Sequence, residues 1–360
     1  MKKTSLFSSF QIKDLVFKNK LFMSPMCQYS AVEGVAQDWH FVHLGARAVG
    51  GAALVMTEAA AVSPEGRISP NDLGIWNLTQ VESLKKITRF ILDNDSVPAI
   101  QLAHAGRKAG TATLWQRSDH SYRKQLWQPI APSPIPFAES YLTPKEMQEN
   151  DLNKVKNDFV NSASLAFQAG FKVIEIHMAH GYLLHEFLSP ISNQRTDQYG
   201  GPLKNRIKFP LEIAKAVRSE WPLSLPLFVR ISASDWITDG WSVDDSVVFC
   251  NELAKIGVDL IDVSSGGTSL NAIIPQTPGY QVQFSDKIKA ALNKNNFSTL
   301  VSAVGLITSA KQAEEILLEN KADVIFLGRE LLRDPYWPLH AAKELAAEVS
   351  WPNQYERAKT

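Results

Sequence analysis

Eight short apolar segments alternate with amphipathic segments along this chain of 360 residues, and the alternation predicts a single (β/α)8 TIM barrel, an α/β fold. Most of the apolar segments are nearly uninterrupted, as is typical of strands that are covered on both faces. No linker and no change in composition divides the chain. We therefore expect one domain over residues 1–360.

The predicted strands are rich in β-branched and other apolar residues. In chain order they are Lys20–Pro25, Ala53–Ala59, Pro98–His104, Lys172–His177, Pro226–Ser232, Val258–Ser264, Thr299–Val304 and Ala322–Gly328. Between them, apolar residues recur at three- and four-residue spacing, for example over 81–94 and 152–170, which predicts helices. Gly170 and Gly257 follow two of these helical segments and are typical of helix C-termini.

A doubly wound open sheet is the alternative α/β architecture. Such a sheet usually carries a glycine-rich fingerprint after its first strand, whereas residues 24–27 read Ser-Pro-Met-Cys. Two long loops are also expected. One follows the third strand, from about residue 105 to 144, and contains Trp115, Tyr122 and Trp127, and the other covers 266–284 after the sixth strand. Both begin at carboxyl ends of strands, where barrel enzymes build their sites.

The composition excludes several classes of protein. The 37 Lys+Arg residues balance 37 Asp+Glu residues, which argues against a nucleic-acid binder because phosphate contacts need clustered cations. No segment approaches the roughly 18 consecutive apolar residues that a membrane span needs, and the first residues are not typical of a signal peptide. Only Cys27 and Cys250 are present, so we expect no disulfide framework and a cytoplasmic location.

Polar residues at the carboxyl ends of the predicted strands would converge on one mouth of the barrel. They are Cys27, Glu58, Gln101, His104, His177, Arg230, Ser264 and Arg329. One such residue would be weak evidence, but polar groups on most of the strand ends indicate a site.

His177 and His180 follow the fourth strand, and the sequence leaves three interpretations open. They are structural histidines, or metal ligands together with His185 and Glu186, or donors of hydrogen bonds to a substrate oxygen. The metal interpretation lacks a recognised ligand spacing such as His-Glu-x-x-His. In the third interpretation Tyr182 is a proton source, since a phenol with a pKa near ~10 keeps its proton at neutral pH.

An arginine, a glycine-arginine group and the two cysteines also admit a structural and a functional interpretation. Arg230, in an apolar strand, pairs with Glu175 on the neighbouring strand or stabilises negative charge on a bound cofactor. Gly305, Gly328 and Arg329, after the last two strands, form the phosphate site common in barrels or ordinary turns. A lone cysteine is more often a small buried apolar residue, which suits Cys250 within a helix better than Cys27 at the mouth.

Seven segments, in order, resemble the Old Yellow Enzyme family of flavin-dependent ene-reductases, and within it a bacterial branch of YqjM-like and xenobiotic-reductase enzymes. They are MSPMCQYSA, EAAAVSPEGRIS, IQLAHAGRKA, FKVIEIHMAHGYLLHEFLSPISNQRTDQYGG, LFVRISASDW, DLIDVSSGG and VIFLGRELLRDP. The resemblance runs from about Phe7 to Arg357. The insertion over 111–128 is longer than in the simplest YqjM-like members and is more similar to the xenobiotic-reductase branch.

The resemblance implies that FMN binds non-covalently at the barrel mouth and that the site holds no metal. The implied FMN-binding residues are Ser24, Pro25, Met26 and Cys27 along the isoalloxazine, Ala59 and Gln101 on its pyrimidine side, Arg230 beside N1 and O2, and Gly305, Gly328 and Arg329 at the phosphate. Cys27 is implied to be a thiol that tunes the flavin potential and not a nucleophile.

The resemblance also implies a reaction in two hydride transfers. NADPH or NADH reduces flavin N5, and the flavin hydride then adds to the β-carbon of an enone, enal or maleimide. His177 and His180 bind the carbonyl oxygen, Tyr182 protonates the α-carbon, and Tyr29 lines the substrate pocket. Arg357, in a tail of about residues 350–360, is implied to reach the site of a neighbouring subunit in a homodimer or higher homo-oligomer. A solvated tail arginine is the alternative.

Two other functional classes fit the sequence less well. A barrel lyase or aldolase would need a Schiff-base lysine or a metal cluster at a strand end, and neither is evident. A flavin-binding sensor would not need His177, His180 and Tyr182 together. The related dienoyl-CoA reductases carry a cysteine cluster for an iron–sulfur centre, which two cysteines cannot supply.

Overall fold

The computed structural model describes residues 4–113, 115–116 and 126–359. Eight parallel strands close into a barrel, which confirms the predicted fold class. In chain order they are β3 (Leu21–Met23), β4 (Leu54–Ala61), β5 (Val97–Ala103), β8 (Val173–Met178), β9 (Leu227–Ser232), β10 (Leu260–Ser264), β11 (Leu300–Ala303) and β12 (Val324–Leu327). β12 pairs with β3, so the sheet has no edge and the open-sheet alternative is wrong.

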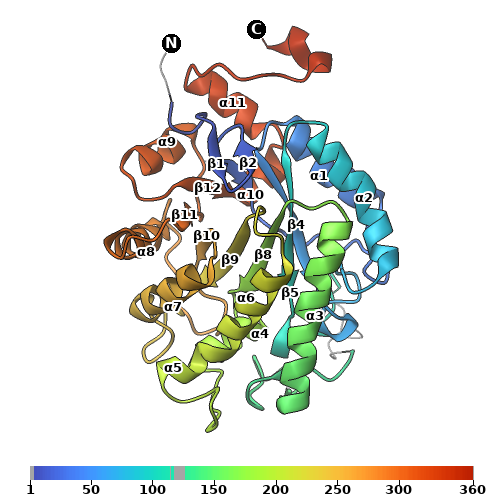
Figure 1. The fold of residues 1–360 in the computed structure, drawn as a ribbon, viewed down its shortest axis with the longest axis vertical. Helices are drawn as coiled ribbons and strands as arrows, with labels where there is room; N and C mark the ends of the chain where they lie inside the picture. Colours follow the sequence, from blue (N-terminus) through green and yellow to red (C-terminus); the bar gives the residue numbers. More distant parts are fainter. Residues whose placement is uncertain (1–3, 114, 117–125, 360) are drawn as a thin grey trace.

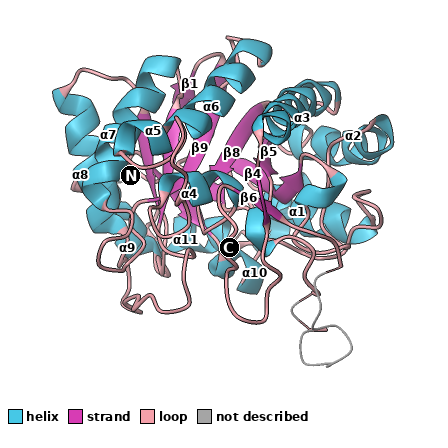
Figure 2. Cartoon of the chain, turned by 90° about the horizontal axis from the view of Figure 1, so that it is seen from below, coloured by secondary structure: helices cyan, strands magenta, loops and turns pink. Residues whose placement is uncertain are grey.

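Helices surround the strands (Figure 1, Figure 2). The longer ones are α1 (Asp38–Val49), α2 (Leu78–Leu92), α3 (Glu149–Gln168), α6 (Lys208–Glu220), α7 (Val243–Ile256), α8 (Val282–Lys294), α9 (Ala310–Leu318) and α11 (Trp337–Glu344), and the shorter ones are α4 (Leu183–Leu188), α5 (Leu203–Arg206) and α10 (Arg329–Arg333). α3 buries Leu152, Val155 and Phe159 against the barrel, as its apolar spacing predicts. Gly257 ends α7 with φ +94°, a left-handed conformation that favours glycine.

A hairpin of β1 (Phe10–Ile12) and β2 (Leu15–Phe17) precedes the barrel and was not predicted from the sequence. Its phenylalanines stack on one another, with ring centroids of Phe10 and Phe17 5.2 Å apart. Phe17 lies 4.9 Å from Phe22 of β3, which in turn meets Phe326 of β12 at 5.4 Å. The hairpin therefore covers the amino end of the barrel with aromatic side chains and leaves the carboxyl ends of the strands as its mouth.

Two connections at the mouth are long. Between β5 and α3 lie η2 (Gly106–Lys108) and a small sheet of β6 (Ile130–Ala131) and β7 (Lys145–Glu146). Most of the predicted aromatic insertion, including Tyr122, lies outside the described residues. Residues 265–281 join β10 to α8 without a helix or strand.

A further short helix is η1 (Pro64–Gly66), after β4.

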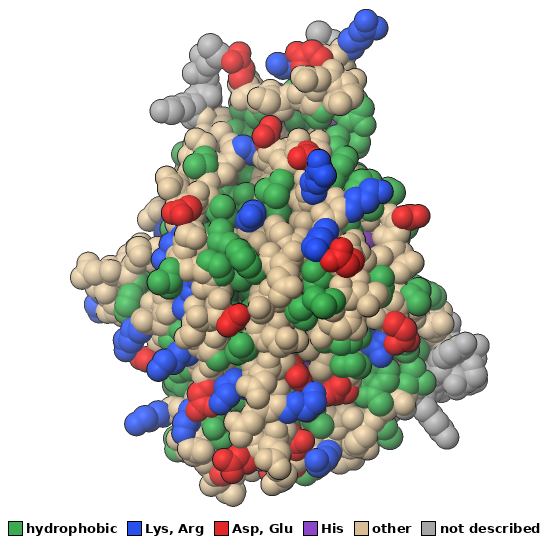
Figure 3. Space-filling view, turned by 45° about the vertical axis from the view of Figure 1, so that its right-hand side comes forward, with side chains coloured by type: hydrophobic (Ala, Val, Ile, Leu, Met, Phe, Trp, Pro, Cys, Tyr) green, Lys and Arg blue, Asp and Glu red, His purple; other side chains and the backbone are tan. Residues whose placement is uncertain are grey.

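The segment after α11 projects at the top of Figure 1 and ends in η4 (Asn353–Ala358). On the face shown in Figure 3, cationic and anionic side chains are intermingled, in keeping with the balanced composition. Within the described part of the chain, no helix combines the length and apolar character that crossing a membrane requires.

Candidate active site

Charged side chains from adjacent strands meet at the mouth because of the strand register. Arg230 of β9 lies opposite His177 of β8 on one side and opposite Asp262 of β10 on the other. Arg230 Nε is 3.2 Å from Asp262 Oδ2. The interpretation in which Arg230 forms an ion pair with Glu175 is therefore wrong. Glu175 stands level with Phe228, two residues before the arginine, and Arg230 pairs with Asp262 instead.

Glu175 has a different contact. Its Oε1 accepts a hydrogen bond of 2.8 Å from Gln101 Nε2, which fixes the orientation of that amide. Burial raises the pKa of Glu175 well above its usual range, the charge of Asp262 raises it further, and Arg230 opposes both. Asp262, whose pKa burial also raises against the pull of Arg230, accepts a hydrogen bond of 2.5 Å from Ser302.

The two histidines of the predicted pair lie side by side. The ring centroids of His177 and His180 are 5.2 Å apart, with the planes nearly perpendicular. His177 Nδ1 accepts the backbone N–H of Ala179 at 3.2 Å, so the neutral ring carries its proton on Nε2. His180 Nε2 is 2.7 Å from the hydroxyl of Ser264. Burial, and then the charge of Arg230, lower both histidine pKa values well below their usual range. Both rings are therefore neutral at pH 7.

The metal interpretation of this segment has no geometric support. His185 Nδ1 accepts the backbone N–H of Gly181 at 2.8 Å, and Glu186 Oε1 accepts that of Arg107 at 2.9 Å. These two side chains are therefore used to hold backbone. Among the described residues, no group of three or more His, Cys, Asp or Glu side chains has a metal-binding arrangement.

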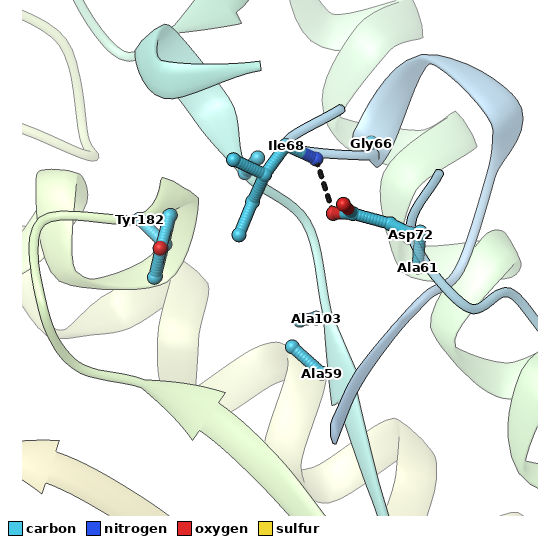
Figure 4. A pocket seen from close by; sticks show the side chains of 8 residues that line it. Ala59, Ala61, Gly66, Ile68, Asp72, Ala103 and Tyr182 are labelled. Atoms are coloured by element: carbon cyan, nitrogen blue, oxygen red, sulfur yellow. Dashed lines mark hydrogen bonds between the residues drawn. The ribbon is translucent and has the colours of Figure 1, made fainter. Parts of the chain in front are cut away.

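Tyr182 joins the histidine pair on one side and an apolar hollow on the other. Its ring centroid is 5.1 Å from that of His177. The hollow is lined by Ala59, Ala61, Gly66, Ile68, Asp72, Ala103, Ala105 and Tyr182 (Figure 4). Cys27 and Tyr29 pack against the same small cluster as Tyr182. Of the predicted site residues, Ala59 and Tyr182 thus line the hollow, and Cys27 and Tyr29 pack on the apolar cluster that forms one side of it.

Asp72 lines this hollow, and Cys27 packs on the apolar cluster beside it. Burial raises the pKa of the Cys27 thiol well above its usual range, and the carboxylates of Asp72 and Glu58 raise it further, so the sulfur is a thiol at neutral pH. Asp72 accepts the Ile68 backbone N–H at 2.7 Å, drawn dashed in Figure 4. Burial raises the pKa of Asp72 to about 7, even though hydrogen bonds from Ser69 lower it.

The turn between β8 and α4 is held from several directions. His180 has φ +59°, which is uncommon for a residue with a side chain. Its N–H donates to Ser232 Oγ at 2.8 Å, and its carbonyl accepts from Lys108 Nζ at 2.8 Å. Lys108 also donates to the carbonyl of Gly267, so one ammonium joins three loops of the mouth.

Sequence reasoning assigned no role to Lys108, Ser232 or Ser264. Ser264 was among the polar residues at strand ends, but its contact with His180 was not predicted. Lys108 carries no comparable signal, since the carbonyls it contacts lie 72 and 159 residues further along the chain.

A second hollow lies between the ends of β11 and β12. Its lining includes Gly305, Gly328 and Arg329, the predicted phosphate residues, and also Glu330 and Arg333, which pair with each other. Gly305 has φ +112°, and a Cβ there would lie 2.5 Å from Gln281 Nε2, so only glycine fits. Ser24, whose Cβ is 3.9 Å from the position of a Cβ built on Gly328, has a buried Oγ without a hydrogen-bond partner among the described residues. Backbone, glycine and guanidinium groups together suit an anion.

The tail residue Arg357 stands apart from both hollows. It is exposed on η4 and lines neither of them. The tail is fixed to the barrel through Tyr355, whose ring centroid is 5.9 Å from that of Tyr336. The predicted role of Arg357 in a neighbouring subunit stays a prediction, because the residue does not line either hollow of its own chain.

Two comparisons of the sequence with known proteins found matches over nearly the whole chain. The family model described as "NADH:flavin oxidoreductase / NADH oxidase family" matches residues 5–348. A curated NADPH dehydrogenase from Bacillus cytotoxicus is 48% identical over 357 residues, which cover 99% of this chain and 97% of that protein.

Two solved structures show likeness of fold alone, because their sequence identity is low. Morphinone reductase in complex with tetrahydroNAD has a TM-score of 0.77 at 24% identity, covering 98% of this chain and 93% of that one. A complex of 2-naphthoyl-CoA reductase with 2-naphthoyl-CoA has a TM-score of 0.83 at 22% identity and covers 94% of this chain. This chain spans 52% of the length of that reductase.

Proposed function

Because the chain belongs to the NADH:flavin oxidoreductase / NADH oxidase family, the family of Old Yellow Enzyme, we propose that it reduces the C=C bond of electron-poor alkenes such as enones, enals and maleimides. It is an oxidoreductase whose cofactors are FMN and NAD(P)H. The observation that carries the proposal is the grouping of two neutral histidines and a tyrosine beside an apolar hollow. We further propose that residues 1–360 form one FMN-binding domain.

The residues present fit FMN. The hollow lined by Gly305, Gly328 and Arg329 suits its phosphate, and the buried Ser24 Oγ beside it lacks a partner that a ligand would supply. The other residues proposed to hold FMN are Pro25, Met26, Cys27, Ala59, Gln101 and Arg230. When bound, FMN supplies the hydride chemistry, taking a hydride from NAD(P)H and giving it to the alkene.

His177 and His180 are proposed to bind the carbonyl oxygen of the substrate. His177 offers Nε2–H as a donor, because the Ala179 backbone occupies Nδ1. Neutral imidazoles donate a hydrogen bond without giving up a full proton, so they stabilise a developing enolate oxygen without trapping it as the enol. Arg230, at the same register level, is proposed to stabilise negative charge on the cofactor side of the site.

Tyr182 is proposed to deliver a proton to the α-carbon. A phenol is suited to this step, since its ordinary pKa is ~10. The ring is part of the lining of the apolar hollow. Tyr29, which packs on the same cluster, is proposed to line the substrate pocket.

The first experiment follows the visible spectrum of the purified protein. The flavin absorption bands should bleach with NADPH in the absence of oxygen and return when 2-cyclohexenone is added. A protein that takes up no FMN would overturn the proposal, and bleaching without recovery would exclude this class of substrate.

The roles of single residues are tested by stopped-flow spectroscopy of the two half-reactions. Tyr182→Phe should slow recovery by the enone by about 10²-fold or more and leave bleaching by NADPH nearly unchanged. Tyr199→Phe, which removes a phenol that contacts Glu212, is the control and should affect neither step. Equal slowing of both steps in Tyr182→Phe would contradict its role as proton donor.

Arg357 is proposed to enter the substrate site of a second copy in a homodimer or higher homo-oligomer. The proposal is supported by its exposure on a projecting tail. Arg357→Ala should raise KM for the alkene without changing KM for NADPH. A monomeric protein in sedimentation analysis, or an unchanged KM for the alkene, would refute it.

A further inference from the structure

A buried polar network lies behind the turn that carries His180 and Tyr182. At the centre of that turn is Gly181, with φ +67°. A Cβ on this residue would lie 2.3 Å from the carbonyl oxygen of Gly267, so the turn is packed directly against the backbone of the loop after β10. The Gly181 N–H is buried by this packing and needs an acceptor.

The acceptor is His185 Nδ1, at 2.8 Å. A neutral imidazole has one acceptor nitrogen and one protonated nitrogen. Since a backbone N–H can only donate, His185 must carry its proton on Nε2. The hydrogen bond that fixes the catalytic turn thus requires one tautomer of a residue that does not itself face the hollow.

Asp235 stands on the other side of the imidazole. Its Oδ1 is 3.3 Å from His185 Nε2, a close electrostatic contact whose geometry is not that of a hydrogen bond, and it accepts the hydroxyl proton of Thr268 at 2.6 Å. The Thr268 oxygen is also 3.1 Å from His185 Nδ1, but its single proton is directed to Asp235, which leaves Nδ1 to Gly181.

The second carboxylate oxygen of Asp235 also accepts hydrogen bonds. Oδ2 accepts the backbone N–H of Trp241 at 2.8 Å and the hydroxyl of Ser189 at 2.6 Å. Burial by itself raises the pKa of Asp235, but the neighbouring His185 and hydrogen bonds from Ser189 and Thr268 outweigh it and lower the pKa to about 2. Both oxygens therefore accept, as only a carboxylate can do.

We propose that Asp235 is a positioning residue whose carboxylate selects the Nε2–H tautomer of His185 and thereby holds Gly181, and with it His180 and Tyr182, in the geometry for proton delivery to the alkene. The position of the turn is an inference from contacts in this chain, and its catalytic effect rests on the proposed function. None of the three network residues, Asp235, His185 and Thr268, needs to touch the substrate.

The effect of Asp235→Asn follows from the donors around the two oxygens. The Trp241 N–H can only donate, so the amide oxygen stays at the Oδ2 position and the NH2 group takes the Oδ1 position. A donor then faces His185 Nε2, and the imidazole proton moves to Nδ1. Two N–H groups now oppose each other at Gly181, and the turn is displaced.

A double-mutant cycle with His185→Gln separates this effect from general loss of packing. A glutamine cannot change tautomer: its oxygen accepts from Gly181 and its NH2 group donates to either Asp235 or an asparagine. We expect Asp235→Asn to slow alkene-dependent flavin recovery by about 10–100-fold with His185 present, and by less than about 3-fold in the His185→Gln background. Bleaching by NADPH should change little in all four proteins.

Nitrogen NMR of the histidine-labelled holoenzyme gives a readout that does not depend on activity. The His185 signals, identified by their loss in His185→Gln, should show a protonated Nε2 in the wild type and a protonated Nδ1 in Asp235→Asn. An unchanged tautomer, or an equal loss of rate in both backgrounds, would overturn the proposal. If the wild type reduces no alkene, the proposed function fails, while the tautomer measurement still decides whether Asp235 controls His185.

Discussion

Replacement of Gly181 by alanine measures how much the turn that carries His180 and Tyr182 depends on close packing. An alanine at φ +67° costs about 1–2 kcal/mol relative to glycine. Its Cβ would also lie 2.3 Å from Gly267 O and 2.8 Å from Thr268 Cα, both backbone atoms that cannot rotate away. Such overpacking adds about 1–3 kcal/mol, so we expect a loss of about 2–5 kcal/mol in the free energy of unfolding.

The same contact predicts the effect on activity. A carbon and an oxygen need about 3.3 Å between them, so the turn and the loop after β10 must separate by about 1 Å. A displacement of that size at a reacting group costs about 10²-fold in rate. The loss should fall on alkene-dependent flavin recovery and not on bleaching by NADPH.

Gly201 provides the matched control. It has φ +77°, and nothing lies within 4 Å of a Cβ built on it. Gly201→Ala should therefore lose only the backbone contribution of about 1–2 kcal/mol in urea unfolding and retain its rate. If the two variants lose the same stability and the same activity, packing of Gly181 against Gly267 does not position the turn.

Three further outcomes are expected. Arg230→Met should destabilise the protein by about 3–5 kcal/mol in urea unfolding, because it leaves Asp262 buried without its cation. Adding Asp262→Asn should restore part of the lost stability. No restoration would mean that loss of the ion pair is not the cause. Burial raises the pKa of Glu186 to about 8, so the folded state holds a proton that the unfolded state releases near pH ~4.5. Stability should fall as pH rises from about 5 to about 8, and urea unfolding of Glu186→Gln should show a shallower fall; identical slopes would exclude this carboxyl. Because the pKa values of His177 and His180 are well below the usual range, kcat/KM for the alkene should show no histidine titration between about pH 5 and 8, and a step near pH ~6.5 would show that one of them is charged.

The barrel and the approximate strand limits could be predicted from the sequence because buried parallel strands are short apolar runs. β9 begins at Leu227 and ends at Ser232, against a predicted Pro226–Ser232. The polar residues at strand ends were predictable for the same reason, since each marks where a strand leaves the core. The β1–β2 hairpin was not, because three-residue strands give too little alternation to identify.

Contacts between distant side chains could not be predicted. Arg230 pairs with Asp262 and not with Glu175 because of the register between the strands. In strands that are buried on both faces, the hydrophobic pattern alone does not determine that register. His185 and Asp235 are 50 residues apart, and their meeting depends on the loop after β9 folding back over α4. The sequence shows which groups stand at the mouth of a barrel, and the structure is needed to show which of them touch.

The phenylalanines of the β1–β2 hairpin are part of the apolar cluster that fills the barrel beneath its charged mouth. They fill the amino end, where Phe17 and Phe22 are fully buried, so the column beneath the mouth is lined by apolar side chains. The energy between two charges rises as the dielectric constant falls, and a closed apolar column keeps that constant far below the value of water. The strength with which Arg230 attracts Asp262, and responds to any negative charge that develops near it, is thus maintained in part by residues 10–17, at the far end of the molecule.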